Sequence, residues 1–235
     1  MLTRLHLPRI VAALSLLLPL SLLVADSGGT PAELDRVLER FTAAQDSTDS
    51  LRCRFEERKE LSLLKEPVVQ TGVFYHSKPG LYLWDYQSPT QKQVLLTDEV
   101  LLAYYPDLNR AEEVNVRRWT NRIRQYLGVG EDPEALRQDY EISLGSPDDG
   151  DLVSADVLVL VPKTPKMKKR LTELRIWLDA KTGQTRRVSY LNPDGDRTTF
   201  TFSNIQVNPE IDASRYEIEL PRNVKMGDTF SGFSG

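Results

Sequence analysis

Few side chains in this sequence of 235 residues could act as nucleophiles or metal ligands. It contains one cysteine, Cys53, and two histidines, His6 and His76. A single cysteine excludes a disulfide scaffold and every zinc or iron–sulfur site that is built on several cysteines. Cys53 lies in the alternating run 51–55, where we favour a small apolar side chain on a buried face over a nucleophile working with His76. We therefore expect no enzyme activity, no catalytic residue, no metal site and no cofactor.

Other short motifs match known binding sites only in part. The run 128–133 begins like a dinucleotide-binding glycine motif, but Pro133 replaces the third glycine and no strand precedes it. The aspartate runs 148–151 and 194–196 lack the spacing of a calcium loop, so we interpret them as turns. A basic loop is interpreted as a solvated loop, with a docking patch for an acidic partner or anionic headgroups as the alternative. Its basic residues are Lys163, Lys166, Lys168, Lys169 and Arg170.

Length and charge restrict the class of protein. The chain is long enough for one globular domain, and its 30 basic against 34 acidic residues give a formal net charge of -4. An acidic total disfavours nucleic-acid binding, which depends on basic surface.

The N-terminus resembles a secretory signal. Arg4 and Arg9 precede an uncharged apolar run, 10–25, which is shorter than the roughly 20 residues of a membrane-spanning helix. We expect residues 1–25 to be a signal peptide cleaved near Ala25 and the mature protein to lie outside the cytoplasm. Residues 26–226 would then form a single domain and residues 227–235 a flexible tail.

A first helix and many strands are predicted after the signal, and residues 117–137 interrupt the strands with apolar residues at helical spacing. Thr30, Pro31 and Glu33 are typical of a helix start, and apolar residues then recur at helical spacing. After residue 49 the apolar period changes to two. Strands are expected at 51–61, 68–77, 80–86, 91–97, 100–105, 110–117, 138–145, 155–162, 171–180, 184–191, 197–206 and 215–220. The pattern predicts a mainly β (α+β) fold, a curved antiparallel sheet with a few helices over one face.

Aromatic side chains gather on one face of this sheet. A period of two places Tyr82, Trp84 and Tyr86 on the same side, and other strands contribute similar alternating pairs. Such stripes are usually plain core. The alternative is the wall of a cavity, because a sheet of this many strands must curl and the predicted helices offer too little apolar surface to fill the hollow.

Several segments together resemble one known family. They include Lys-Pro-Gly-Leu-Tyr-Leu-Trp-Asp-Tyr at 78–86 and Phe-Thr-Phe-Ser-Asn-Ile at 200–205, followed by Asn208 and by Ile-Asp at 211–212. With the signal sequence and the amphipathic helix, they are similar to the periplasmic outer-membrane lipoprotein carrier family, LolA, over nearly the whole mature chain.

The resemblance implies an incomplete, curved antiparallel β-barrel of about eleven strands, with helices covering its concave opening. It implies a monomeric carrier that binds the acyl chains of lipoproteins in a hydrophobic cavity. Such a carrier receives them from an inner-membrane lipoprotein-releasing ABC transporter and passes them to an outer-membrane lipoprotein acceptor. The acceptor is itself a lipoprotein, so the lack of a cysteine after the apolar run favours the carrier. The alternatives are a binder of another lipid or glycolipid, and an envelope domain that senses lipoproteins.

Site residues follow from the resemblance and the alternating faces. The lipid-binding cavity is expected to be lined by Phe55, Phe74, Tyr82, Trp84, Tyr86, Val188, Tyr190, Phe200 and Phe202. The lid and its contacts are expected to be Leu34, Leu38, Phe41, Lys78, Ile123, Tyr126 and Leu127. Lys78 stands where the family usually has arginine, and because lysine has fewer donors, closure of the lid is expected to be looser.

Overall fold

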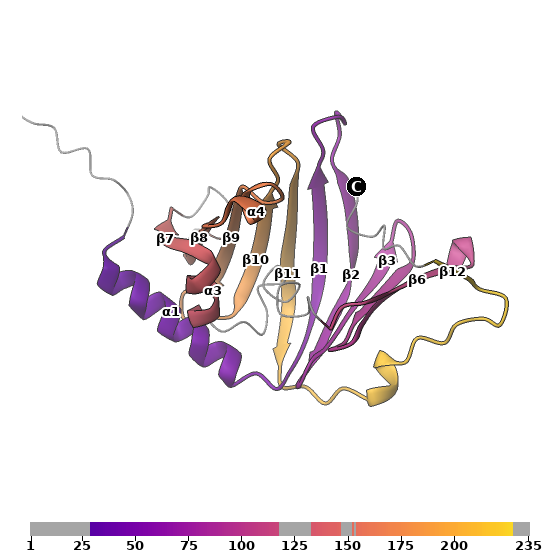
Figure 1. Cartoon of the computed structure of the whole chain (residues 1–235). Helices are drawn as coiled ribbons and strands as arrows, with labels where there is room; N and C mark the ends of the chain where they lie inside the picture. The colour runs from indigo at the N-terminus through magenta and orange to yellow at the C-terminus, as the bar shows by residue number, and fades with distance from the viewer. Residues whose placement is uncertain (1–28, 118–132, 147–151, 153, 228–235) are drawn as a thin grey trace, which may run out of the picture.

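A computed structural model describes residues 29–117, 133–146, 152 and 154–227, which form one curved sheet with helices against it (Figure 1). The helices are α1 (Pro31–Asp46), η1 (Pro106–Leu108), α3 (Pro133–Asp139), α4 (Pro165–Lys168) and η2 (Ala213–Tyr216). The strands are β1 (Ser50–Glu60), β2 (Val68–Ser77), β3 (Leu81–Ser88), β4 (Lys92–Leu96), β5 (Val100–Tyr105), β6 (Arg110–Asn115), β7 (Tyr140–Gly145), β8 (Ala155–Pro162), β9 (Glu173–Asp179), β10 (Thr185–Leu191), β11 (Arg197–Val207) and β12 (Lys225–Gly227).

The twelve strands lie in the order β12-β6-β5-β4-β3-β2-β1-β11-β10-β9-β8-β7. Neighbours are antiparallel except β12, which runs parallel to β6. The mainly β class and the open, curved antiparallel sheet are therefore confirmed. The strands come from two consecutive meanders that meet where β1 pairs with β11, so the two ends of the domain are joined at the centre of the sheet.

Some sequence predictions fall outside the described residues. They are the signal peptide (1–25), the tail beyond Gly227, and the lid residues Ile123, Tyr126 and Leu127. Within the described part of the chain, no helix has the length and apolar character needed to cross a membrane.

The strand predicted at 215–220 is wrong. Tyr216 ends the short helix η2, residues 217–220 pair with no strand, and the last strand is β12 instead. The alternation was nevertheless real, because Tyr216, Ile218 and Leu220 pack on the sheet. They lie over its surface rather than within its hydrogen-bond ladder, and a period of two cannot distinguish these two arrangements.

The C-terminal segment covers one face of the sheet, which we call the outer face. Tyr216 joins Val73, Tyr75, Leu83 and other buried side chains of β2 to β6, and Ile211, Ile218, Leu220 and Val224 pack beside them. In Figure 1 this segment runs around the outside of the sheet. The opposite face, on which α1 packs, is called the inner face.

Helix α1 begins and packs as its sequence predicts. The Thr30 hydroxyl accepts a hydrogen bond from the Glu33 backbone N–H at 3.3 Å, and Pro31 occupies the first turn. Val37, Leu38 and Phe41 form a buried stripe, and Phe41 is 0% exposed. These side chains belong to the same apolar cluster as the inner-face residues of the sheet.

The turn between β9 and β10 approaches the backbone of α1 closely. Gly183 has a φ of +73°, and a Cβ there would lie 2.4 Å from the carbonyl oxygen of Arg40. A side chain at this position would push the helix away from the sheet. Gly195, in the β10–β11 turn, has a φ of +92° but open space around it, so it provides a matched comparison.

We predict that Gly183→Ala lowers the free energy of unfolding by about 2–4 kcal/mol, because a left-handed backbone and a steric clash both oppose the methyl group. Gly195→Ala should cost only the backbone part, about 1–2 kcal/mol. Urea denaturation of the two variants measures the difference. An equal decrease in the free energy of unfolding of the two variants would show that the close approach of α1 to this turn does not disfavour a side chain at Gly183.

Candidate functional site

An aromatic band crosses the middle of the inner face. Its eight side chains come from five neighbouring strands, β10, β11, β1, β2 and β3, and are Tyr190, Phe200, Phe202, Phe55, Phe74, Tyr82, Trp84 and Tyr86. The strand register brings them together: Phe55 lies opposite Phe202, and Phe74 lies opposite Trp84. Residues that alternate along each strand therefore form one continuous apolar surface.

The rings of the band contact one another across the strands. Phe55 meets Tyr86 edge to face with ring centroids 4.9 Å apart, and Phe74 lies 4.9 Å from Trp84. Phe74 is also 6.2 Å from Phe202, which links β2 to β11. Such pairs contribute about 0.5–1.5 kcal/mol each beyond the area they bury. The band is consequently a well-fixed surface.

A glycine makes room for the centre of the band. Gly72 lies opposite Phe55 on β1 and Tyr86 on β3. A Cβ at Gly72 would lie 2.8 Å from the Phe55 ring and 2.2 Å from the Asp85 carbonyl oxygen. The Phe55 ring can lie flat against the strand only because this position has no side chain.

Helix α1 contributes apolar side chains to the same cluster. Leu38 and Phe41 are buried in it, and Leu34 packs at its edge. From the sheet, Val188 is buried next to Phe200, its partner across β10 and β11. Helix α1 and the band thus belong to one apolar cluster.

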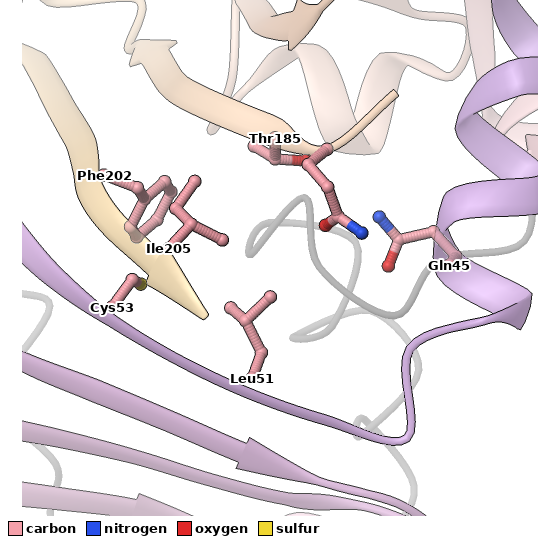
Figure 2. A pocket seen from close by; sticks show the side chains of 7 residues that line it. Gln45, Leu51, Cys53, Thr185, Phe202 and Ile205 are labelled. Atoms are coloured by element: carbon pink, nitrogen blue, oxygen red, sulfur yellow. The ribbon is translucent and has the colours of Figure 1, made fainter. Parts of the chain in front are cut away.

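A small pocket remains where the end of α1 meets the band. It has an empty volume of about 250 Å³, which includes space open to solvent, and it is lined by Gln45, Leu51, Cys53, Gln184, Thr185, Phe202 and Ile205. Figure 2 shows Gln45 reaching from α1 toward Leu51 and Phe202 on the sheet. The enclosed part of the pocket is only about 10 Å³, far below the roughly 300–1,000 Å³ of typical ligand pockets, so the described structure has no room for an acyl chain here.

The other end of the inner face has a polar border. Glu57 follows Phe55 on the same side of β1 and is 3% exposed. The Lys59 Nζ lies 3.8 Å from its carboxylate, and the Lys92 Nζ lies 3.9 Å from the centroid of the Tyr86 ring. Burial, then the negative charge of Glu57 and a hydrogen bond to it, raise the pKa of Tyr86. Burial lowers the pKa of Lys92, although the charge of Glu57 opposes this shift.

Polar contacts at the end and along the sides of α1 also hold the helix in place. The Lys78 Nζ donates to the carbonyl oxygen of Asp46 at 2.9 Å and lies 3.3 Å from the Asp49 carboxylate. Arg40 pairs with Asp156 on β8, and Arg137 of α3 pairs with Asp35 at 2.5 Å. A cation at the carbonyl end of a helix is favourable. These contacts are polar and partly exposed, so each contributes little individually.

All nine predicted cavity residues lie in the inner-face cluster, as do Leu34, Leu38 and Phe41. Lys78 differs, because it is exposed at the end of α1. The polar border was not predicted from the sequence, although the sequence contains a signal for it. One side of β1 carries Leu51, Cys53, Phe55 and then Glu57, so the apolar alternation ends on a carboxylate.

Cys53 and His76 are not arranged as a nucleophile and its base. Cys53 lies opposite Phe74, whereas His76 lies opposite Leu51. The His76 ring stacks on Tyr82, and its Nδ1 lies 3.0 Å from the Leu81 carbonyl oxygen. Burial raises the pKa of the Cys53 thiol to about 12, which opposes formation of the reactive thiolate. Among the described residues, no three metal-binding side chains of His, Cys, Asp or Glu come together.

Comparison with known proteins gives consistent matches. The family model described as outer membrane lipoprotein carrier protein LolA matches residues 46–219. An outer-membrane lipoprotein carrier protein of Chromohalobacter salexigens is 27% identical over 188 residues, covering 78% of this chain and 82% of that protein. One from Ralstonia nicotianae is 25% identical over 190 residues, covering 79% and 84%.

Among solved structures, an uncharacterized conserved protein from Thermus thermophilus superposes with a TM-score of 0.54 at 8% identity. The match covers 84% of this chain and 99% of that one. This likeness supports the fold alone.

We predict that Cys53 does not react with a soluble disulfide reagent at pH 8 in the folded protein, because its thiol is 2% exposed and titrates at about pH 12. In denaturant one equivalent should react rapidly. Absorbance of the released thiol measures both states. Rapid reaction of the folded protein would reopen the nucleophile hypothesis.

Proposed function

The chain belongs to the outer membrane lipoprotein carrier (LolA) family, and from this premise we propose that its inner face binds the acyl chains of lipoproteins during their passage across the periplasm. The observation that carries the proposal is the aromatic band, an apolar surface five strands wide that belongs to the same apolar cluster as α1.

The energetic need for such a surface is large. Exposing a CH₂ group to water costs about 0.8 kcal/mol, so an acyl chain of about sixteen carbons carries on the order of 10 kcal/mol. Unassisted transfer through water would therefore be negligible. An apolar surface that replaces water along the chain removes most of this cost without making or breaking a covalent bond.

We further propose that an acyl chain displaces α1 rather than filling a permanent hollow. Leu38 and Phe41 of α1 belong to the same apolar cluster as the band, and Gln45 near the end of α1 lines a pocket together with Phe202. Replacing the two apolar side chains with hydrocarbon exchanges one apolar contact for another, so the net affinity stays modest. Modest affinity allows release at the far side without an energy source.

The polar border supports one orientation of the cargo. Glu57 and Lys92 stand at the end of the band near Tyr86, and burial of these groups beside an alkyl tail is unfavourable. We propose that the polar end of the lipid lies near them and that its hydrocarbon extends toward Phe202 and the pocket beneath α1.

The direction of transport is part of the same proposal. The protein would be secreted by cleavage near Ala25 and act as a monomer in the periplasm. It would receive cargo from an inner-membrane lipoprotein-releasing ABC transporter and pass it to an outer-membrane acceptor.

Mass spectrometry of lipids bound to protein purified from the periplasm tests the cargo directly, because it separates lipoprotein acyl chains from another lipid or glycolipid and from an empty sensor domain.

We predict that Phe202→Glu abolishes binding of a fluorescent acyl probe, because a carboxylate would stand in the path of the hydrocarbon. Tyr75→Glu provides the control, since Tyr75 is similarly buried but lies on the outer face. It should reduce stability without reducing probe affinity in the fraction that remains folded. Circular dichroism establishes folding of both variants.

Should Phe202→Glu fail to fold, Phe202→Trp fills the pocket without adding charge and should also weaken probe binding. Probe affinity that is unchanged in a folded Phe202→Glu variant would reject the inner face as the binding site.

We also predict that Lys78→Met speeds exchange of a bound acyl probe by about two- to fivefold, the kinetic equivalent of losing about 0.3–1 kcal/mol at the helix terminus. Lys181→Met, in an exposed turn at the same edge of the sheet, is the control. Stopped-flow fluorescence measures the rates. Equal rates in wild type and Lys78→Met would mean that this contact does not restrain α1.

A further inference from the structure

Exposed apolar side chains gather at one end of the strands. We call this end the upper rim, and it is formed by the loops 61–67, 89–91, 106–109, 163–172 and 192–196. Six of the eight large hydrophobic side chains that are exposed in the described residues lie in these loops or within two residues of them: Leu63, Leu64, Val68, Val69, Leu108 and Val161. Met226 lies beside the rim, opposite Ala111 in the pairing of β12 with β6. Only Val207 lies at the opposite edge.

The β1–β2 hairpin carries the most prominent of these side chains. Leu63 is 94% exposed and Leu64 is 52% exposed at the tip. The tip is braced, because the Ser62 backbone N–H donates to the Asp196 carboxylate of the neighbouring hairpin at 2.6 Å. Two leucines held outward on a braced turn are a costly arrangement in water, and they contribute nothing to the core.

A basic loop shares this rim. Lys163, Lys166, Lys168, Lys169 and Arg170 lie between β8 and β9, and all five are exposed. The Lys163 Nζ donates to the carbonyl oxygen of Arg137 at 2.6 Å. The loop 163–172 contains no acidic residue, and none of the five forms an ion pair with another described residue. The rim loops carry six basic residues, these five and Lys65, against the four acidic residues Glu66, Asp107, Asp194 and Asp196, so the positive excess of the rim is small. This excess is opposite in sign to the net charge of the whole chain.

The hairpin and the basic loop are close enough to act together. Figure 1 places the β1–β2 hairpin, the β10–β11 hairpin and α4 at the same end of the strands. β9 and β1 are separated by β10 and β11 in the sheet, which corresponds to about 14 Å at the usual strand spacing. One flat surface could therefore contact both loops.

We propose that the upper rim docks on the surface of a phospholipid bilayer that carries anionic headgroups. The basic loop would lie among the phosphates, and Leu63 and Leu64 would enter the boundary between headgroups and acyl chains. A bilayer fits better than a protein partner, because leucines projecting singly from a convex tip need a fluid apolar medium, whereas a protein hot spot needs a matching pocket.

Co-sedimentation with vesicles tests the proposal, using the protein purified from the periplasm. We expect binding to vesicles of phosphatidylcholine with one third phosphatidylglycerol, weakened by high salt, and little binding to phosphatidylcholine alone. Lys168→Gln should reduce the partition coefficient about fivefold and Leu63→Ser about tenfold. The controls at the opposite edge, Lys181→Gln and Val207→Ser, should leave it unchanged.

Absence of binding to the anionic vesicles would overturn the proposal and leave an acidic protein as the partner of the basic loop. An equal decrease of the vesicle partition coefficient in the rim variants and the control variants would also overturn the proposal. Acyl-probe binding is measured on the same preparations. Loss of vesicle docking with retained probe binding rejects only this inference, whereas docking without probe binding rejects only the carrier proposal.

Discussion

The apolar inner face of the sheet has to be covered, and this requirement governs the rest of the structure. Aromatic side chains bury about 150–250 Å² each, so a band of eight of them cannot face water without a large loss of stability. A curved sheet cannot cover its own inner face, because its strands diverge around the hollow. The cover must come from elsewhere, and α1 contributes part of it through Val37, Leu38 and Phe41. Under the proposed function, hydrocarbon of a bound acyl chain would take over part of this cover from α1.

The two faces of the sheet are covered in different ways. On the outer face the C-terminal segment packs through Tyr216 and its neighbours, and β12 then adds to the sheet edge beside β6. That cover is fixed at both ends by the sheet itself. On the inner face, α1 joins the sheet at one end, where Asn208 accepts from the backbone N–H groups of Asp49 and Ser50 and donates to the Ser47 carbonyl oxygen. This junction provides a firm pivot, while the remaining contacts of α1 are a few partly exposed ion pairs and apolar side chains.

Much of this arrangement could be predicted from the sequence, because alternation along a strand fixes which side chains share a face. The run from Tyr82 to Tyr86 and the pair Phe200 and Phe202 indicated the band before any strand pairing was known. The pairing of β1 with β11 was not predictable, since it depends on contacts between residues about 150 apart. The sequence predicts a strand at 215–220 because packing over a sheet and pairing within it give the same period, whereas the structure has the end of η2 followed by an unpaired segment. The role of Glu57 was not predicted, because a carboxylate at an inward-facing position only indicates where the apolar alternation ends. Its interaction with Lys92, on β4, depends on the strand pairing and cannot be inferred from the sequence.

Separation of the apolar band from the upper rim has a mechanical consequence. The pivot of α1 at Asn208 lies at the lower end of β11, whereas Leu63, Leu64 and the basic loop lie at the opposite end of the strands. The polar border of Glu57 and Lys92 stands between the band and that rim. A lipid taken from a surface at the rim would therefore meet polar groups first and the aromatic band next, with its tail directed toward the pivot. Because charge is screened within about 8 Å at physiological salt, the acidic remainder of the chain would not oppose approach through the basic loop, but it would disfavour approach through any other face. The same distribution of charge would therefore favour the orientation in which the proposed docking rim faces an anionic surface.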